Sequence, residues 1–337
     1  MSTVSNIFMR HRIVRCAISV LVAAMLAGAA ATPAASAEEV SPGYTFQDTV
    51  NHGIAFPTFT FRGASLSSGG TGMAARPQSA IQIDNMTGRV RASYIYWSYL
   101  AHGSPSAMES SRISMQRSHP NPAAQPVEMQ GELIGNWPVC GVVGQHARVF
   151  RAQVPGSVVT GNGLYLISPV SPRPSASDGN ASVPGKKWLP IWYGATLFVI
   201  GTGSDVVALY DGITHDANWN RLITTLRLPA LPGTYQTVLL HQFGHGGGRS
   251  DRTGRDYNMS KEITSVNGFA IAGPGSPAHD SDWNGNLYGW NLSKHDVVRA
   301  TVGSEYNRTR LRILLDRNGV GCPRPIGAAV AITPLRP

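Results

Sequence analysis

Cysteine is scarce in this chain, and the position of each cysteine is informative. The sequence has three, Cys16, Cys140 and Cys322. None belongs to a CxxC pair, which disfavours a cysteine metal site. Cys16 lies in an N-terminal leader described below, so one pair remains after the leader. In an oxidising compartment this pair predicts a single disulfide between Cys140 and Cys322, and two unpaired buried thiols are the alternative.

Charged residues are also few, at 14% of the chain, whereas Gly (37) and Pro (23) are abundant. This composition favours a turn-dense, strand-rich protein over a helical one. Beyond the first 37 residues, no helical pattern is longer than about two turns. We therefore expect an all-β fold, a secreted and jelly-roll-like β-sandwich built as one large domain or as two packed sandwich domains.

Several functional motifs are absent. The sequence contains no GxSxG nucleophile elbow, no P-loop and no Rossmann glycine fingerprint, so the hydrolase and nucleotide-binding classes that use them have no support. The chain is basic, with a formal net charge of +9, but its Lys and Arg are scattered and are not interleaved with aromatic residues. We expect no nucleic-acid partner.

The first 37 residues read as a secretory signal peptide. Three arginines precede an apolar stretch over 17–31, and Ala35 and Ala37 supply the small residues of a cleavage site. The apolar stretch is short for a membrane span, and no Cys follows it for a lipid anchor. We expect an extracellular protein that starts at Glu38 and keeps no membrane span. Loss of the three arginines lowers the formal net charge from +9 to +6.

Short β-prone runs, separated by turn residues, account for most of the remaining chain. Strands are expected at 54–61, 80–83, 90–99, 113–116, 127–134, 149–154, 164–167, 195–200, 206–210, 222–228, 234–240, 263–266, 269–271, 297–302, 311–315 and 328–332. The glycine-rich segment 201–205 predicts a hairpin between its two neighbouring strands, and the pair Asn162-Gly163 is a second hairpin signal.

Residues 168–187 are rich in Pro, Ser and Gly and have too few apolar side chains to pack. They predict a long loop within one domain, or a linker. In the second case the linker separates an N-terminal β region (38–167) from a C-terminal β region (188–337).

Several strand motifs carry a family resemblance. They are Val90-Arg-Ala-Ser-Tyr-Ile-Tyr-Trp97, Gly194-Ala-Thr-Leu-Phe-Val-Ile200, Val206-Val-Ala-Leu-Tyr-Asp-Gly212, Val266-Asn-Gly-Phe269 and the segment 282–293. In this order they resemble the "AYLYW", "GASLVVVY…VVLYDG", "NG" and "WDxDxYDVS" segments of a family of secreted, mostly bacterial β-sandwich proteins. Gly289-Trp290-Asn291 departs from the acidic pattern of the last segment. The resemblance implies the fold and export, and it implies no reaction.

One motif has the spacing of zinc ligands. His241, His245 and Asp251 form HxxxHxxGxxD, in which two His one helical turn apart and an Asp beyond a glycine turn can hold zinc. The position of the general base holds Gln242, and an amide cannot accept the proton of zinc-bound water. The surrounding residues are β-prone and rich in glycine. The alternative is a strand that runs into a glycine loop, with His that do not share an ion.

A second motif offers oxygen ligands for calcium. Asp280, Asp282, Asn284 and Asn286 alternate along DxDxNG, as in calcium loops, although no helices flank it and Asn291 replaces the bidentate Glu of an EF-hand. Calcium is therefore the candidate cofactor. Three aromatic residues, Trp283, Tyr288 and Trp290, could stack on sugar rings beside these polar groups. The alternative is an ordinary Asp/Asn/Gly turn with core aromatics.

Arg308, Arg310 and Arg312 alternate with Leu311, Ile313 and Leu315. At the strand period of two, the arginines lie on one face and the apolar residues on the other. The arginine face is either a stripe for anionic cell-wall polymer or an ordinary solvated strand face.

These observations favour an exported, non-enzymatic β-sandwich protein with an extracellular binding or structural role. Its expected partner is cell-wall polymer or glycan, with calcium at 280–286 as a possible aid. The alternative is a metal-dependent hydrolase, or an inactive zincin-like descendant, that uses His241, His245 and Asp251. It requires a helix over 238–247.

Overall fold

The computed structural model describes part of the chain. The described residues are 39–40, 54–73, 76–102, 111–120, 125–138, 145–170, 191–212, 221–230, 235–245, 263–273, 290–296, 310–316 and 324–335. They contain strands and no helix, as the composition predicts. It follows that none of them forms a helix long and apolar enough to cross a membrane. The proposed leader, 1–37, lies outside the described residues.

The strands follow one another in three groups along the chain. The first ten are β1 (Glu39–Val40), β2 (Ile54–Ala55), β3 (Phe59–Gly72), β4 (Ser79–Ile83), β5 (Val90–His102), β6 (Arg112–His119), β7 (Val127–Gln130), β8 (Glu132–Pro138), β9 (Gln145–Gln153) and β10 (Gly163–Val170). The long β11 (Ile191–Asp211) follows. The last seven are β12 (Arg221–Arg227), β13 (Tyr235–His245), β14 (Ile263–Val266), β15 (Phe269–Ala272), β16 (Trp290–Asp296), β17 (Arg310–Asp316) and β18 (Arg324–Pro334).

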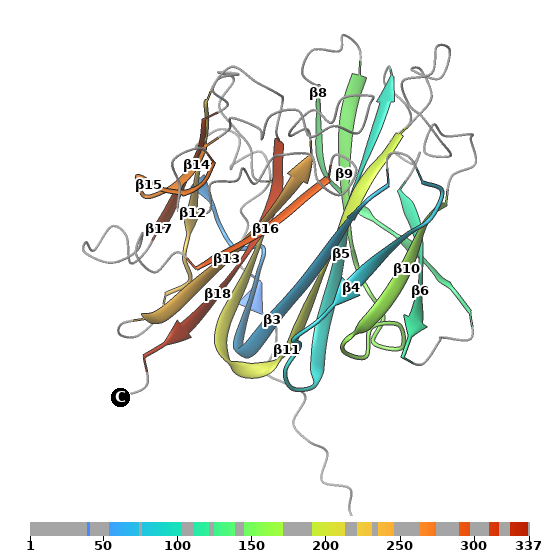
Figure 1. The fold of residues 1–337 in the computed structure, drawn as a ribbon, viewed down its shortest axis with the longest axis horizontal. Coiled ribbons are helices and arrows are strands. Elements are labelled where there is room, and N and C mark those ends of the chain that lie inside the picture. The colour runs from blue at the N-terminus through green and yellow to red at the C-terminus, as the bar shows by residue number, and fades with distance from the viewer. Residues whose placement is uncertain are drawn as a thin grey trace, which may run out of the picture. The chain divides into compact units, whose positions relative to one another are not determined.

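Hydrogen bonding joins these strands into three sheets (Figure 1). The small sheets have the orders β4-β10-β6-β7 and β15-β14-β17-β12-β2. The large sheet has the order β16-β13-β18-β11-β5-β9-β8, with β3 along β11 and β1 beside β3. Every described pairing is antiparallel except that of β12 with β2. The expected all-β, sandwich-type architecture is confirmed.

The large sheet folds back on itself at β11. Asp211 pairs with Gly327, which pairs with Phe243. Phe198 precedes Asp211 by 13 residues, a distance of about 43 Å along a straight strand. The rings of Phe198 and Phe243 are nevertheless only 5.5 Å apart. β11 must therefore double back, and β3, which pairs with it on both sides of the bend, turns with it (Figure 1).

The bend lies at 201–205, where the glycine-rich turn was expected, but the predicted hairpin pairing is wrong. Residues 195–200 pair with β3 and β5, and residues 206–209 pair with β3 and β18. Both edges of each arm are thus occupied by other strands. The two arms of β11 lie in facing layers instead of bonding to each other.

Glycines make this bend possible. Gly63 in β3 has a φ of +58°, a left-handed conformation that favours glycine. A Cβ on Gly203 in β11 would lie 2.4 Å from the carbonyl oxygen of Ala64, so the two strands could not approach as closely with a larger residue.

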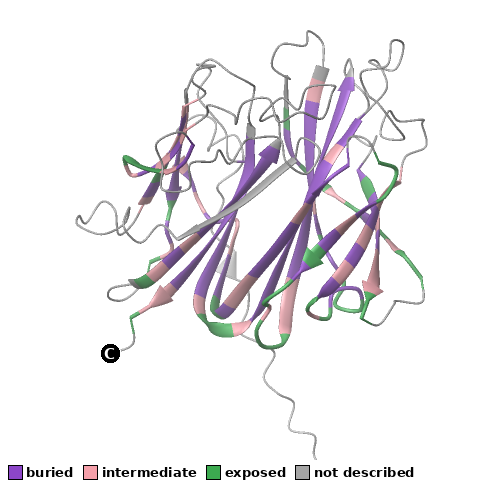
Figure 2. Ribbon diagram, in the orientation of Figure 1, coloured by how far each residue is buried: buried purple, intermediate pink, exposed green. Residues whose placement is uncertain are grey.

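The folded large sheet and the two small sheets form four layers with three hydrophobic cores between them. The first core lies between the β4-β10-β6-β7 sheet and the β5-β9 part of the large sheet, around Trp97, Phe150 and Trp192. The second lies between the two halves of the large sheet, around Phe198 and Phe243. The third lies between β11-β18-β13 and the β15-β14-β17-β12-β2 sheet. Figure 2 shows how burial concentrates in the strands of the large sheet.

The N-terminal and C-terminal β regions share this large sheet. β11, which follows residues 168–187, pairs with β3 and β5, which precede them. Residues 37–337 accordingly form one compact unit. Residues 168–170 belong to β10, and 171–190 lie outside the described residues.

Several other boundaries differ from expectation. The run expected at 127–134 is two strands, β7 and β8, separated at Gly131, where a Cβ would lie 2.4 Å from the ring of Trp97. The Asn162-Gly163 hairpin signal was wrong, because β10 pairs with β4 and β6 and not with the preceding β9. β16 was not expected at all. The strand expected at 297–302 lies outside the described residues.

Candidate functional site

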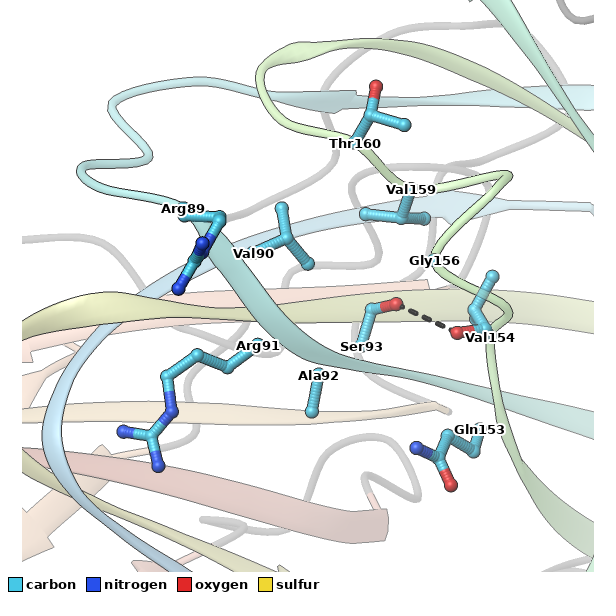
Figure 3. Close-up of a pocket in the computed structure, with 10 residues that line it drawn as sticks. All are labelled: Arg89, Val90, Arg91, Ala92, Ser93, Gln153, Val154, Gly156, Val159 and Thr160. Atoms are coloured by element: carbon cyan, nitrogen blue, oxygen red, sulfur yellow. Dashed lines mark hydrogen bonds between the residues drawn. The ribbon is translucent and has the colours of Figure 1, made fainter. Parts of the chain in front are cut away.

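A pocket of about 290 Å³ lies where β5 begins and β9 ends. Two segments line it, 89–93 and 153–160. Its charged residues are Arg89 and Arg91, and Figure 3 shows their guanidinium groups on the same side of the pocket. Among the pocket residues that the structure describes there is no carboxylate, so the pocket has a positive rim.

The backbone of Arg89 is fixed by the bend of β11. The N–H of Arg89 donates to Thr202 Oγ1 at 2.9 Å, and the N–H of Thr202 donates to the carbonyl of Arg89, also at 2.9 Å. Gly88 has a φ of +71°, and a Cβ there would lie 2.2 Å from Thr202 Oγ1. The exposed side chain of Arg89 therefore projects from a rigid turn.

Arg91 is half-buried and reaches the bend of β3. Its Nη1 donates to the carbonyls of Arg62 and Gly63, at 2.6 and 3.2 Å. Its guanidinium carbon also lies 6.0 Å from the centre of the Phe61 ring. These contacts fix the orientation of one guanidinium group, which reduces the entropy that binding would cost.

The opposite wall is a loop held by buried valines. Val158 and Val159 are almost fully buried in the first core. The N–H of Val154 donates to the carbonyl of Ser93 at 2.8 Å, and Ser93 Oγ donates back to the carbonyl of Val154 at 3.2 Å (Figure 3). Both walls are thus joined across the floor of the pocket and are already formed.

The chemistry of this pocket is that of binding. Arginines recognise carboxylates and phosphates through paired N–H donors. Gln153 and Thr160 add polar groups that can meet hydroxyls. The volume is at the lower end for a small-molecule site, which suits one charged unit of a larger chain. The lining contains neither an activated nucleophile nor a group suited to general acid–base catalysis.

A second polar cluster lies between the two halves of the large sheet. Arg151 on β9 forms ion pairs with Asp211, at the end of β11, and with Glu132 on β8. The Tyr96 hydroxyl donates to Asp211 Oδ1 at 2.8 Å. The Arg151 guanidinium also lies over the Phe59 ring, 4.6 Å from its centre. This cluster joins strands of both halves, which indicates a structural role.

Burial governs the ionisation of this cluster. It raises the pKa of the Tyr96 hydroxyl well above 10.0, and the nearby Asp211 carboxylate adds to that shift. Burial also raises the pKa of Asp211, against the opposing effects of Arg151 and of the Tyr96 hydrogen bond. Burial lowers the pKa of Arg151, but Asp211 outweighs this and the guanidinium stays charged.

The zinc-type geometry is contradicted by the structure. The sequence 235–245 forms strand β13, so the required helix over 238–247 is absent from its described part. His241 is buried, at 2% exposure, and its Nδ1 shares a hydrogen bond of 2.8 Å with Ser68 Oγ. In a strand, His241 and His245 are separated by about 13 Å. The described residues contain no group of three or more His, Cys, Asp or Glu side chains that could hold a metal.

The remaining predicted sites fall outside the described structure. These are Asp251, Asp280, Asp282, Asn284, Asn286, Trp283, Tyr288, Cys140 and Cys322. Trp290 begins β16, where its backbone pairs opposite His245.

The alternation predicted around Arg310 and Arg312 is confirmed. Leu311, Ile313 and Leu315 are buried, whereas Arg312 is exposed and Arg310 is partly exposed. Arg308 lies outside the described residues.

The sequence analysis missed the pocket arginines, although a signal was present. Arg89 and Arg91 also alternate at the start of a strand, directly after Gly88. The pattern is shorter than that of 308–312, and the loop that completes the pocket is more than 60 residues away in the sequence.

Comparison with known proteins places no relative beside this chain. No protein-family model matches it, and no curated protein matches it.

Proposed function

We propose that this protein is an exported, non-enzymatic β-sandwich protein that binds an anionic cell-wall polymer or glycan outside the cell. The pocket that carries Arg89 and Arg91 is the proposed binding site. The observation that carries the proposal is this preformed pocket, which has two arginines and no carboxylate among its described lining residues. The resemblance to secreted, mostly bacterial proteins and the leader over 1–37 support export.

The ligand unit that fits this site is a sugar or polyol carrying one carboxylate or phosphate. The arginines would hold the anion, and Gln153 and Thr160 would contact its hydroxyls. Calcium at 280–286 remains a prediction of the sequence.

Export is tested by producing the full chain from its own leader in a bacterial host. We expect protein in the medium whose first residue, determined by mass spectrometry of the intact chain, is Glu38. An uncleaved chain retained in the cells would contradict export.

Binding is tested by calorimetric titration of the secreted protein with two probes, glycerol phosphate and galacturonic acid. We expect at least one to bind, and Arg89→Gln to weaken that binding about 10- to 100-fold, since a hydrogen bond to a charged group contributes about 1.5–3 kcal/mol. Arg112→Gln is the charge-matched control, because Arg112 pairs with Glu128 on the exposed surface of another sheet. Equal affinities for the Arg89 variant and the control would remove the pocket as the binding site.

A further inference from the structure

A second group of arginines gathers on the outer face of the β15-β14-β17-β12-β2 sheet. Arg227 on β12 is the direct cross-strand partner of Arg310 on β17, and Arg312 is the next residue on the same face of β17. Arg227 and Arg312 are exposed. The positions directly opposite each other are about 4.5–5.5 Å apart and those along one strand about 6.6 Å apart. We call Arg227, Arg310 and Arg312 the arginine face.

The inner side of the same strands explains why these residues point outward. Leu311 and Ile313 on β17 and Leu226 on β12 are buried in the third core. Because side chains alternate along a strand, the even-numbered residues of β17 must face away from that core. The arginine face is therefore fixed by packing of the opposite face.

This arrangement is unfavourable for the isolated fold. Like charges directly opposite on neighbouring strands destabilise a sheet. The described residues around the arginines on this face are Thr225, Ile54, Leu314 and Ser265, by register, and none is acidic. The described carboxylate of this face belongs to Asp316, four residues beyond Arg312 and about 13 Å away along the strand.

The backbone at Arg312 is also clamped. Arg312 N–H donates to Asn267 Oδ1 and Asn267 N–H donates to the carbonyl of Arg312, both at 2.8 Å. Asn267 is in the left-handed region, with a φ of +50°, in the turn between β14 and β15. This turn therefore holds Arg312 in place, so less order must be gained when a ligand binds.

We infer that the arginine face binds a phosphodiester-linked anionic polymer of the cell wall along the sheet, at a site separate from the pocket. Guanidinium groups pair with phosphate oxygens through two N–H donors each, and three of them at spacings of about 4.5–7 Å suit a chain with regularly repeated charges. The described neighbours include no aromatic ring for base stacking, which favours a polymer without bases over nucleic acid. The inference extends the proposed binding role to a polymer, but it rests on a different face.

The test compares a polymer with its monomer. The probes are poly(glycerol phosphate) and glycerol phosphate, titrated into the secreted protein over a range of salt concentrations. We expect Arg227→Gln/Arg312→Gln to weaken polymer binding at least about tenfold and to flatten its salt dependence, because fewer counterions are released. Monomer binding at the pocket stays as in the unaltered protein.

Three controls separate the possible outcomes. Arg112→Gln removes one exposed arginine elsewhere and is expected to leave the polymer affinity unchanged. Arg89→Gln abolishes monomer binding if the pocket proposal is right, and its failure to do so leaves the arginine-face result intact. The double variant is expected to be at least as stable as the unaltered protein, since like charges are removed, so lost binding cannot be ascribed to unfolding.

Three results would overturn the inference. One is an unchanged polymer affinity in the double variant. Another is tighter binding of single-stranded DNA with the same number of phosphates, which would assign the face to nucleic acid. The third is tighter binding of polygalacturonate, which would assign it to a carboxylate polymer.

Discussion

Ser68 Oγ lies 2.8 Å from Nδ1 of His241, and this hydrogen bond joins β3 to β13 across the middle core. The first histidine of the HxxxH motif is thus engaged inside the protein, at 2% exposure. We expect Ser68→Ala to lower the free energy of unfolding by about 1–3 kcal/mol, because it leaves a buried polar group of His241 without this partner. Urea unfolding measures the change.

The matched control is Ser65→Ala, on the same strand but with a partly exposed side chain. Its hydrogen bond to the Thr87 carbonyl, at 2.9 Å, is solvent-accessible, and a cost below about 1 kcal/mol is expected. Equal costs for the two variants would contradict a special role for the Ser68–His241 contact.

The neighbouring Gln242 provides a direct test of the abandoned zinc hypothesis. Gln242 is 2% exposed and lies within β13. Gln242→Glu restores the residue type that a zinc peptidase uses as base, but here it would bury a carboxylate. We expect destabilisation that grows as the pH rises, and no peptidase activity with added zinc. A zinc-dependent gain of peptide hydrolysis would contradict the strand geometry.

The all-β class and most strands were predictable because they depend on local alternation and turn residues. The alternation of Arg310 and Arg312 with buried leucine and isoleucine is the clearest case. The bend at 201–205 was also visible as a glycine-rich turn. Its consequence was not, because whether two arms bond to each other or to β3, β5 and β18 depends on strands far away in the sequence.

The site was less predictable for the same reason. The spacing of His241 and His245 fits zinc only on a helix, and β-prone neighbours made the segment a strand. Conversely, Arg89 and Arg91 become a pocket rim only because Thr202 and the loop after β9 are brought beside them. Sequence spacing shows which side chains share a face, and the long-range pairing determines which faces meet.

Arg151 links the two halves of the large sheet, and its removal would strand the Asp211 carboxylate. We expect Arg151→Gln to cost about 3 kcal/mol at neutral pH, since a buried charge loses its partner. Burial raises the pKa of Asp211 above its ordinary 3.8, and without the cation this pKa rises further. A raised carboxyl pKa gives stability that is full below pH 3.8 and is lost as the pH rises through the folded pKa.

The deficit of Arg151→Gln should therefore shrink as the pH is lowered from 7 toward about 4. Urea unfolding at several pH values measures it. Glu132→Gln is the control, because Glu132 is 67% exposed and its ion pair with the same arginine should contribute less than about 1 kcal/mol. The double variant Arg151→Gln/Asp211→Asn should recover part of the loss. A pH-independent deficit would show that Asp211 is not its source.

Buried tyrosines predict that the fold fails in alkali. Burial raises the pKa of Tyr96, Tyr193 and Tyr210 above 10.0. A raised folded pKa gives stability that is full below pH 10.0 and is lost above it, because the phenols ionise only in the unfolded chain. Each such tyrosine should lower the free energy of unfolding by about 1.4 kcal/mol per pH unit above that value.

Phenolate absorbance, recorded together with circular dichroism, measures this. These phenols should appear in one step that coincides with unfolding, and Tyr96→Phe should reduce the steepness of the alkaline decline by about 1.4 kcal/mol per pH unit. That variant also loses the hydrogen bond to Asp211, so its stability at neutral pH should fall by about 1 kcal/mol or more, which separates the two effects. Gradual ionisation of all tyrosines in an intact fold would contradict the packing of Tyr96 and Tyr210, both of which are at most 1% exposed.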